Sequence, residues 1–509
     1  MRPSYISQMI NEDAEDDMGC VPLTPYALDD LKRYDYAFTG LQIDGNHWIE
    51  RAANVISNHK ELYGIHIDVS YAGSFMCRDN NWLGDLCNGI SQNRSIGSLS
   101  FEGDSYNMDV DIFQILMPFL ENNANLHHIE LHEFDLSQIV FPSFISALSK
   151  CGGFNLVHIS LNDINCSDEA AAIIFNVLNT WENLGYLCFS ENEYIGVEGC
   201  TALSNLLTNP ATCLHSLAFS YNDLDDECLA IVSNALMINT TVEYLELSGN
   251  ENVTSWRTCF PAIFSPHTCS VKRLVLIETN LTDDDVICLG TALIGNKTLK
   301  LLTLVDNASI TLVGWQGLMQ GLRNHSSVLE HLSVDECNID ADGGRMIVTA
   351  LAENSSLKEL TMFQNNLTTV IWDDFYWVLC DESSIQSTYS SNHTLERIWL
   401  RPWLHHDDDV PDYILRLLKM NRNEDKAQVA RQKILENYFY EGGNVRDNAY
   451  QISVFAQMSK ALMPFALEWI GNDDIGFSLM YKVVRGIPTL FGIGHGQQQR
   501  AGAKKRRKC

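Results

Sequence analysis

The sequence of 509 residues has no uninterrupted apolar run of the roughly 18 residues that a transmembrane helix requires. Its opening stretch, MRPSYISQMINEDAEDD, also lacks the apolar centre of a secretory signal. These two absences argue against a protein that spans a membrane or is secreted. We therefore expect an intracellular protein, in the cytoplasm or the nucleus, without membrane contact.

Common catalytic and nucleotide-binding motifs are absent as well. The sequence has no G-x-x-x-x-G-K-[ST], G-x-S-x-G or H-E-x-x-H, and no cysteine accompanies a histidine in a recognisable catalytic signature. We therefore expect no enzyme activity, no cofactor and no bound metal. His128, Glu130 and His132 invite comparison with a metal site, but alternate residues of one strand lie too far apart for tetrahedral ligation.

Positive charge is scarce, since 34 Lys and Arg stand against 65 Asp and Glu, for a formal net charge of −31. Six of the basic residues lie among the last ten, which leaves residues 1–499 with a net charge of −37. Nucleic-acid phosphates need cations across the contact surface. The acidic body therefore argues against nucleic-acid binding and favours a protein partner with a basic segment.

The basic tail has two interpretations. The sequence KKRRK matches a short nuclear-import signal, whose residues are Lys504, Lys505, Arg506, Arg507 and Lys508. It also fits an ordinary basic tail that contacts acidic surfaces without specificity. Both interpretations stay open at this point.

A repeat of one strand and one helix fills most of the chain. In residues 213–239, Leu214, Leu217 and Phe219 fit L-x-x-L-x-L, Asn222 completes the motif, and the following apolar residues have helical spacing. Copies recur mostly every 28 to 30 residues. They begin at Phe38, Leu62, Ile96, Leu126, Leu156, Leu184, Leu214, Val242, Val271, Leu299, Leu329, Leu357 and Leu395. Longer steps predict insertions near residues 70–80 and 370–392.

This periodicity resembles the leucine-rich repeats of the ribonuclease-inhibitor type. The resemblance implies an α/β solenoid, or horseshoe, with a parallel concave sheet and convex helices. We expect an acidic N-terminal tail over residues 1–33, about thirteen repeats over residues 34–404, a helical C-terminal cap over residues 405–490 and a flexible basic tail over residues 491–509. The cap resembles that of uncharacterised intracellular repeat proteins, through the phrase NRNEDKAQVARQKIL.

The ninth position of the repeat predicts how the chain turns after each strand. Asn, Thr or Cys at this position can satisfy backbone groups that leave the strand ladder. These residues are Asn46, Asn192, Asn222, Asn250, Thr279, Asn307, Cys337 and Asn365. Phe134, Ile164 and Trp403 cannot do this, so we expect irregular turns or a shifted register there.

Because the side chains of a strand alternate between the two faces of a sheet, the repeat positions predict which residues lie on the inner face. If positions one, four and six face the core, then positions three, five and seven face outward. Aromatic and acidic side chains gather there and at position eight, a combination suited to Lys or Arg side chains of a partner. We define the inner-face strip as His128, Glu130, His132, His158, Asp163, Tyr186, Glu191, Tyr221, Tyr244 and Glu246. The alternative is a set of solvated strand residues without a partner.

The same repeat positions also predict an aliphatic patch on the inner face. We expect an exposed aliphatic patch that needs a cover, formed by Val275, Ile277, Leu301 and Val305.

The repeats also resemble those of GTPase-activating proteins for Ran, which supply an arginine from an early loop. The corresponding loops here offer Arg78 and Arg94, neither in a matching motif, so we prefer a scaffold or adaptor that binds a protein and keep the activator as an alternative.

Overall fold

The computed structural model describes residues 21–22, 41–44, 49–58, 60, 62, 64–68, 81–103, 111–136, 140–151, 155–192, 195–265, 269–323, 327–400, 410–438, 440–441 and 444–445. The chain forms two compact units, an N-terminal unit (Met1–Leu281) and a C-terminal unit (Thr282–Cys509). The predicted nuclear-import residues, Trp403, Arg78 and the expected insertion at residues 70–80 lie outside the described residues.

The N-terminal unit alternates strands and helices. Its strands are β1 (Val21–Pro22), β2 (Leu41–Asp44), β3 (Gly64–Asp68), β4 (Ser98–Glu102), β5 (His128–His132), β6 (His158–Asn162), β7 (Tyr186–Ser190), β8 (Ser216–Ala218), β9 (Tyr244–Glu246) and β10 (Arg273–Val275). Its helices are α3 (Ile49–Asn58), α4 (Asn81–Gln92), α5 (Ile112–Asn122), α6 (Phe141–Cys151), α7 (Asp168–Leu178), α8 (Val197–Thr208), α9 (Asp226–Leu236), the 3-10 turn η2 (Trp256–Thr258) and α10 (Phe260–Ile263). Each strand pairs in parallel with the next along the chain.

The C-terminal unit continues the same alternation and adds extra helices. Its parallel strands are β11 (Leu301–Thr303), β12 (His331–Ser333), β13 (Glu359–Thr361) and β14 (Arg397–Trp399). Its helices are α11 (Asp283–Leu293), α12 (Leu312–Leu322), α13 (Ala341–Ala350), η3 (Leu351–Glu353), α14 (Ile371–Leu379), α15 (Ile385–Tyr389), α16 (Asp412–Asn421) and α17 (Lys426–Tyr438), followed by an antiparallel pair, β15 (Tyr440–Glu441) and β16 (Asn444–Val445). The expected insertion at residues 370–392 supplies α14 and α15.

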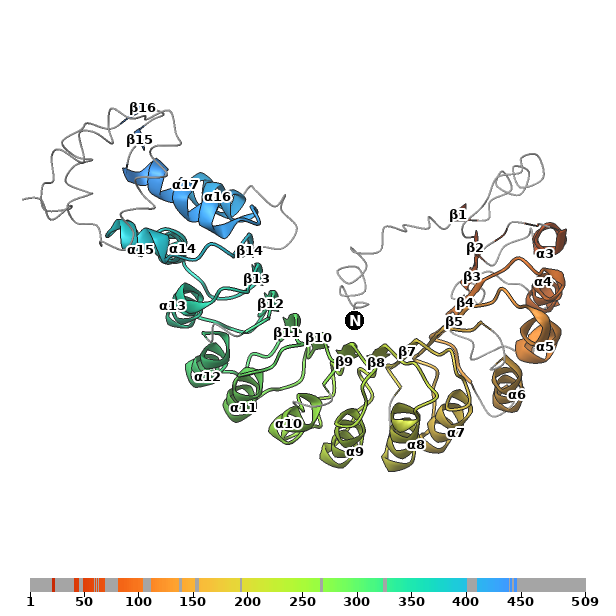
Figure 1. Cartoon of the computed structure of the whole chain (residues 1–509). Coiled ribbons are helices and arrows are strands. Elements are labelled where there is room, and N and C mark those ends of the chain that lie inside the picture. Colours follow the sequence, from red (N-terminus) through yellow and green to blue (C-terminus); the bar gives the residue numbers. More distant parts are fainter. Residues whose placement is uncertain are drawn as a thin grey trace, which may run out of the picture. The chain divides into compact units, whose positions relative to one another are not determined.

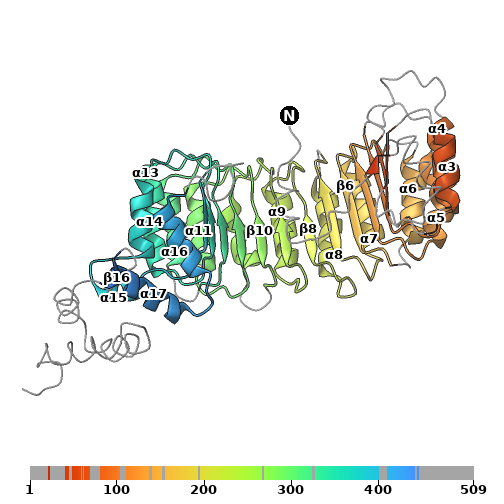
Figure 2. The ribbon, with the colours of Figure 1, turned by 90° about the horizontal axis from the view of Figure 1, so that it is seen from above.

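Both units are leucine-rich-repeat solenoids, as the sequence predicts. Within each unit the strands lie side by side on one face and the helices cover the other (Figures 1 and 2). Leu214, Leu217 and Phe219 of one repeat are fully buried between these layers, together with Val232 of the following helix. Full burial of each such side chain contributes about 1.5–3 kcal/mol, which a lone strand or helix could not obtain.

The Asn residues at position nine form the expected ladder and also link successive repeats. Asn222 is fully buried, and its Nδ2 donates to the carbonyl of Phe189 at 2.7 Å. Its Oδ1 accepts from the backbone N–H of Asn192 in the preceding repeat at 3.0 Å. Asn192 in turn accepts from the N–H of Ile164 at 3.0 Å. Each amide therefore satisfies the turn of its neighbour.

The link between Asn192 and Ile164 explains why the expectation of irregular turns or a shifted register at Phe134 and Ile164 is wrong. Phe134 and Ile164 are buried, and strands β5 and β6 keep the register His128↔His158 without a shift. The turn at Ile164 needs no Asn of its own because Asn192 satisfies its N–H. The turns are also regular, since the residue before each ninth position has a positive φ in repeat after repeat.

A second link between repeats joins the helices and has no counterpart in the sequence predictions. Asp168, the first residue of α7, accepts hydrogen bonds from the N–H groups of Gly196 and Gly199 at 2.9 and 2.7 Å. Asp226 and Asp283 do the same for the segments that begin at Thr254 and Thr311. Each carboxylate thus caps unsatisfied N–H groups at the start of the next repeat's outer segment.

Candidate functional site

The inner-face strip of the N-terminal unit begins with a stack of three rings. His128, His158 and Tyr186 occupy position three of strands β5, β6 and β7, which lie in register. The ring centroids of His128 and His158 are 4.0 Å apart, and those of His158 and Tyr186 are 3.9 Å apart with an interplanar angle of 29°. Neighbouring strands lie about 4.8 Å apart, so rings at one position of successive strands meet face to face. The sequence count thus correctly brings these three residues together.

Both histidines in the stack present neutral rings. Burial, together with neighbouring His128 and His127, lowers the pKa of His158 to about 3. Burial also lowers the pKa of His128, against the opposing effect of Glu130. The stack therefore offers flat, uncharged aromatic surface at neutral pH.

Tyr221 reaches past the next repeat to an acidic residue two repeats along. Its ring lies directly over Gly249, where a Cβ would come within 2.0 Å of the ring atom Cδ1. Its hydroxyl donates to Glu278 Oε2 at 2.8 Å. Gly249 also has a φ of +65°, so this position favours glycine for two reasons. Glu278 belongs to the same surface, although the predicted strip omits it.

Tyr244 and Glu246 form a pair on strand β9. The Tyr244 hydroxyl donates to Glu246 Oε2 at 2.7 Å, and the hydroxyls of Ser248 and Ser220 also hydrogen-bond to this carboxylate. Burial raises the pKa of Glu246, while the hydroxyls lower it. The groups that support this half-buried carboxylate are therefore neutral.

A row of acidic residues follows the strand ends at position eight. Glu133, Asp163 and Glu191 are exposed and have φ values of 52°, 48° and 60°. Burial raises the pKa of Glu191, and Asp163 and Glu133 raise it further, whereas His132 lowers it. Residues other than glycine lose roughly 1–2 kcal/mol in this left-handed conformation. The turn geometry thus holds three acidic side chains along one edge of the inner face.

His132 lies beside Glu102 of the preceding repeat. Its Nδ1 lies 3.8 Å from Glu102 on strand β4, and the other oxygen of Glu102 lies 3.1 Å from His66 Nε2 on strand β3. Glu130 instead accepts from Ser100 Oγ at 3.1 Å. The sequence analysis missed His66, although a count from Leu62 places it at position five. Among the described residues no group of His, Cys, Asp and Glu could hold a metal ion.

The inner face of the C-terminal unit carries its own counter-charges. Glu359 lies 2.7 Å from Arg397 Nη2 and 3.2 Å from His331 Nδ1, and it accepts from Trp399 Nε1 at 2.7 Å. Asp335 is satisfied by Ser333, Thr361 and the N–H of Phe363, and its burial raises its pKa to about 6. On this face Glu359 therefore has basic neighbours, whereas Asp335 is held by hydroxyls and a backbone N–H.

The expected aliphatic patch is wrong in part. Val275 and Ile277 are 2% and 4% exposed, and Leu301 and Val305 are half-buried. Side chains on neighbouring strands pack against one another across the narrow strand spacing, which covers short β-branched groups. The positional count gives the face of a residue but not the size of its neighbours.

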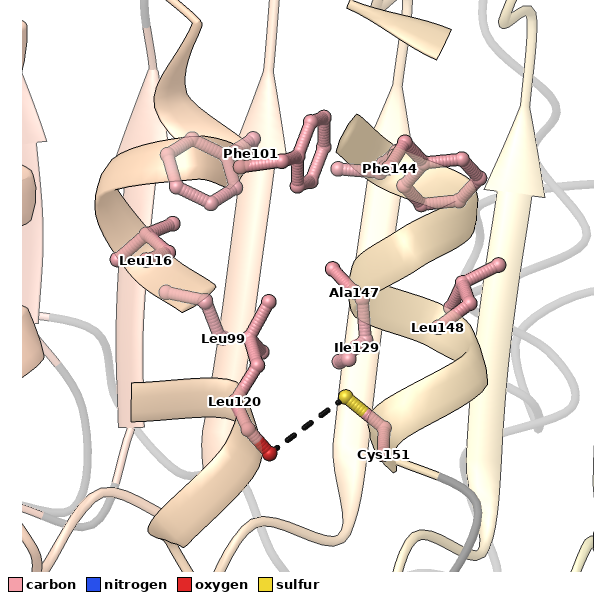
Figure 3. A pocket seen from close by; sticks show the side chains of 11 residues that line it. Leu99, Phe101, Leu116, Leu120, Ile129, Phe144, Ala147, Leu148 and Cys151 are labelled. Atoms are coloured by element: carbon pink, nitrogen blue, oxygen red, sulfur yellow. Dashed lines mark hydrogen bonds between the residues drawn. The ribbon is translucent and has the colours of Figure 1, made fainter. Parts of the chain in front are cut away.

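A cavity between α5 and α6 is too small to hold a ligand. Its volume is about 10 Å³, roughly one water molecule, and its lining is apolar (Figure 3). Cys151 at its edge donates to the carbonyl of Leu120 at 3.6 Å. The inner face is therefore a better candidate for binding than this interior space.

Arg94 bears on the alternative of a GTPase activator. Its Nη1 donates to the carbonyl of Ser91 at 3.1 Å, so it caps the end of its own helix, α4. It is exposed. The alternative of a GTPase activator stays a prediction.

None of the helices in the described part of the chain is both long and apolar enough to cross a bilayer.

Comparisons with known proteins agree with the repeat architecture. No protein-family model matches the chain. The chain is 26% identical over 215 residues to "NACHT, LRR and PYD domains-containing protein 5" of Mus musculus, which covers 41% of this chain and 18% of the relative. It is 26% identical over 273 residues to protein 14 of the same series from Homo sapiens, covering 53% and 24%, and 25% identical over 324 residues to protein 9B from Mus musculus, covering 62% and 31%. The chain therefore spans less than a third of the length of each of these relatives, all of which carry leucine-rich repeats by name.

Proposed function

We propose that this chain binds a protein partner, without catalysis, through the inner-face strip of its N-terminal unit. The observation that carries the proposal is the combination of stacked neutral rings from His128 to Tyr186 with carboxylates such as Glu246 that hydrogen-bond to hydroxyls. Aromatic side chains supply contact area at low entropic cost, and carboxylates supply charge selectivity. The repeats of the relatives support a role in binding but not the identity of a partner.

The partner surface should be basic. The carboxylates at position eight stand in a row, and the chain as a whole is strongly acidic. The C-terminal unit pairs Glu359 with Arg397 and His331, so its inner face has less need of external cations. Lys or Arg side chains would therefore gain most along the N-terminal unit.

A preformed surface makes such binding effective. The strands and the Asn ladder hold the strip in place, and Gly249 fixes the path of Tyr221. Docking on a rigid surface costs little conformational entropy in this chain, so modest contacts yield useful affinity.

The test is a triple variant, Tyr186→Ala, Tyr221→Ala and Tyr244→Ala, in affinity purification with mass spectrometry. The main partner recovered with the wild-type chain should be lost with this variant. Trp377→Ala with Tyr413→Ala is the matched control, because both aromatic residues are exposed on the C-terminal unit. Equal recovery by the triple variant and the wild type would reject the proposed surface.

A turnover assay distinguishes a GTPase activator from a scaffold. A scaffold forms stoichiometric complexes, whereas an activator in trace amounts speeds GTP hydrolysis by a small GTPase and depends on one arginine.

We also propose that the repeats are of the ribonuclease-inhibitor type, since each complete repeat pairs a strand with a helix. An intracellular location and a nuclear-import role for residues 504–508 remain part of the proposal, and deletion of residues 497–509 tests the latter.

A further inference from the structure

Strand β8 lies between two strands that each carry a tyrosine on the inner face. It lies between β7 and β9, with the register Tyr186↔Ser216↔Tyr244 at position three. The side chains at positions three, five and seven of its repeat are the small Ser216, Ala218 and Ser220. Two aromatic rings therefore flank a row of small side chains, of which Ala218 and Ser220 are buried.

The carboxylate of Glu246 interacts with groups on both sides of strand β8. Glu246 lies two residues after Tyr244, accepts its hydroxyl at 2.7 Å and hydrogen-bonds to the Ser220 hydroxyl of the β8 repeat. Its charge also acts on Tyr186 on the far side of β8, where it raises the pKa of the phenol that burial has already raised. The Glu246 carboxylate therefore interacts with both Tyr186 and Tyr244.

The nature of the support around Glu246 distinguishes it from Glu359 of the C-terminal unit. Glu359 of the C-terminal unit has Arg397 and His331 beside it. Glu246 has the hydroxyls of Tyr244, Ser220 and Ser248. Burial of a carboxylate held by hydroxyl donors costs stability, and a cation from another molecule can stabilise it.

Building on the proposed function, we infer that the half-buried Glu246, Tyr186 and Tyr244 form an anchor site for one Lys or Arg side chain of the protein partner. The aliphatic stem of such a side chain packs on the tyrosine rings. Its charged end pairs with the Glu246 carboxylate. Burial raises the pKa of this carboxylate in the free chain, and a bound cation favours the charged form and acts against that shift.

The experiment selects short random peptides displayed on phage against the full chain. The tightest peptide is then synthesised as selected, and again with its central Arg or Lys replaced by citrulline or norleucine. Binding of both peptides to wild type, Glu246→Gln and Glu359→Gln is measured by titration calorimetry. Glu359→Gln is the matched control because it removes an inner-face carboxylate that already has basic neighbours.

We expect selected peptides rich in Lys or Arg. Glu246→Gln and the neutral peptide should each weaken binding roughly tenfold or more, and the two changes together should cost much less than their sum. Glu359→Gln should leave the affinity within a factor of about two. Glu246→Gln should also unfold at an equal or higher urea concentration at pH 7, since the amide carries no charge to bury.

Several results would overturn the inference. Selected peptides without Lys or Arg, or equal binding to Glu246→Gln and wild type, would reject Glu246 as the anchor. A marked loss of stability in Glu246→Gln would also reject it, because the carboxylate would then be a structural group. If the triple tyrosine variant still loses the peptide in these cases, the proposed function stands and only the anchor fails. If the triple variant keeps the peptide, or wild type selects none, both fail.

Discussion

The ring of Tyr221 lies directly over Gly249, so closely that a Cβ on Gly249 would come within 2.0 Å of ring atom Cδ1. The glycine belongs to the turn of one repeat and the tyrosine to the turn of the preceding repeat. The contact lets the tyrosine hydroxyl reach Glu278, one repeat farther along. A backbone position therefore decides where a side chain of the proposed binding surface points.

Gly249→Ala should lower the free energy of unfolding by about 2–4 kcal/mol, from overpacking against the ring and from the left-handed backbone. Gly295→Ala is the control, because Gly295 has a φ of +86° but no atom within 4 Å of an added Cβ. That variant should lose only about 1 kcal/mol. Urea unfolding followed by circular dichroism measures both, and equal losses would contradict a role for the Tyr221 contact.

Asn222→Ala should destabilise the chain by about 2–4 kcal/mol, because it leaves the Phe189 carbonyl and the Asn192 N–H without their partners. Asn205→Ala, at an exposed position of α8, should change the stability by less than about 0.5 kcal/mol. The same urea experiment compares them. A small effect of Asn222→Ala would mean that water replaces the lost amide.

The His128–His158–Tyr186 stack should weaken in acid. Because the pKa of His158 is lowered to about 3 in the folded chain, the unfolded chain binds a proton more readily between pH 6.5 and 3, and stability falls as pH falls through that window. Between pH 7 and pH 5 this residue alone should cost about 2 kcal/mol. His158→Phe keeps a ring in the stack and should lose less stability over that interval. Identical pH profiles for the two chains would contradict the prediction.

Lys433 of α17 should make the C-terminal unit more stable at alkaline pH. Its side chain is 1% exposed, and Nζ donates to the carbonyls of Leu379 and Asn392 at 2.7 and 3.0 Å. Burial lowers its pKa to about 7, so the unfolded chain holds the proton more tightly between pH 7 and 10.5 and stability rises across that window. Hydrogen exchange of α17 at pH 7 and pH 9 should show the increase, and Lys433→Met should remove it.

Much of the fold follows from local order in the sequence. The alternation around Leu217 and the spacing from Leu229 to Leu236 predict one strand and one helix, and these form as β8 and α9. The ninth position correctly predicts the buried amides of Asn192, Asn222 and Asn250. The stack from His128 to Tyr186 also follows, because equal positions of successive repeats meet side by side. The predicted domain bounds and the role of the inner-face strip stay predictions.

The tertiary structure decided which residues from different repeats meet, and how closely. Val275 is covered and the ring of Tyr221 lies over Gly249, although neither can be read from the repeat positions. The physical reason is that periodicity depends on contacts within about ten residues, whereas these contacts join residues about thirty apart. The sequence by itself determined the faces of each strand and helix. Lateral packing between repeats determined the partner, the burial and hence the charge state of the side chains on those faces.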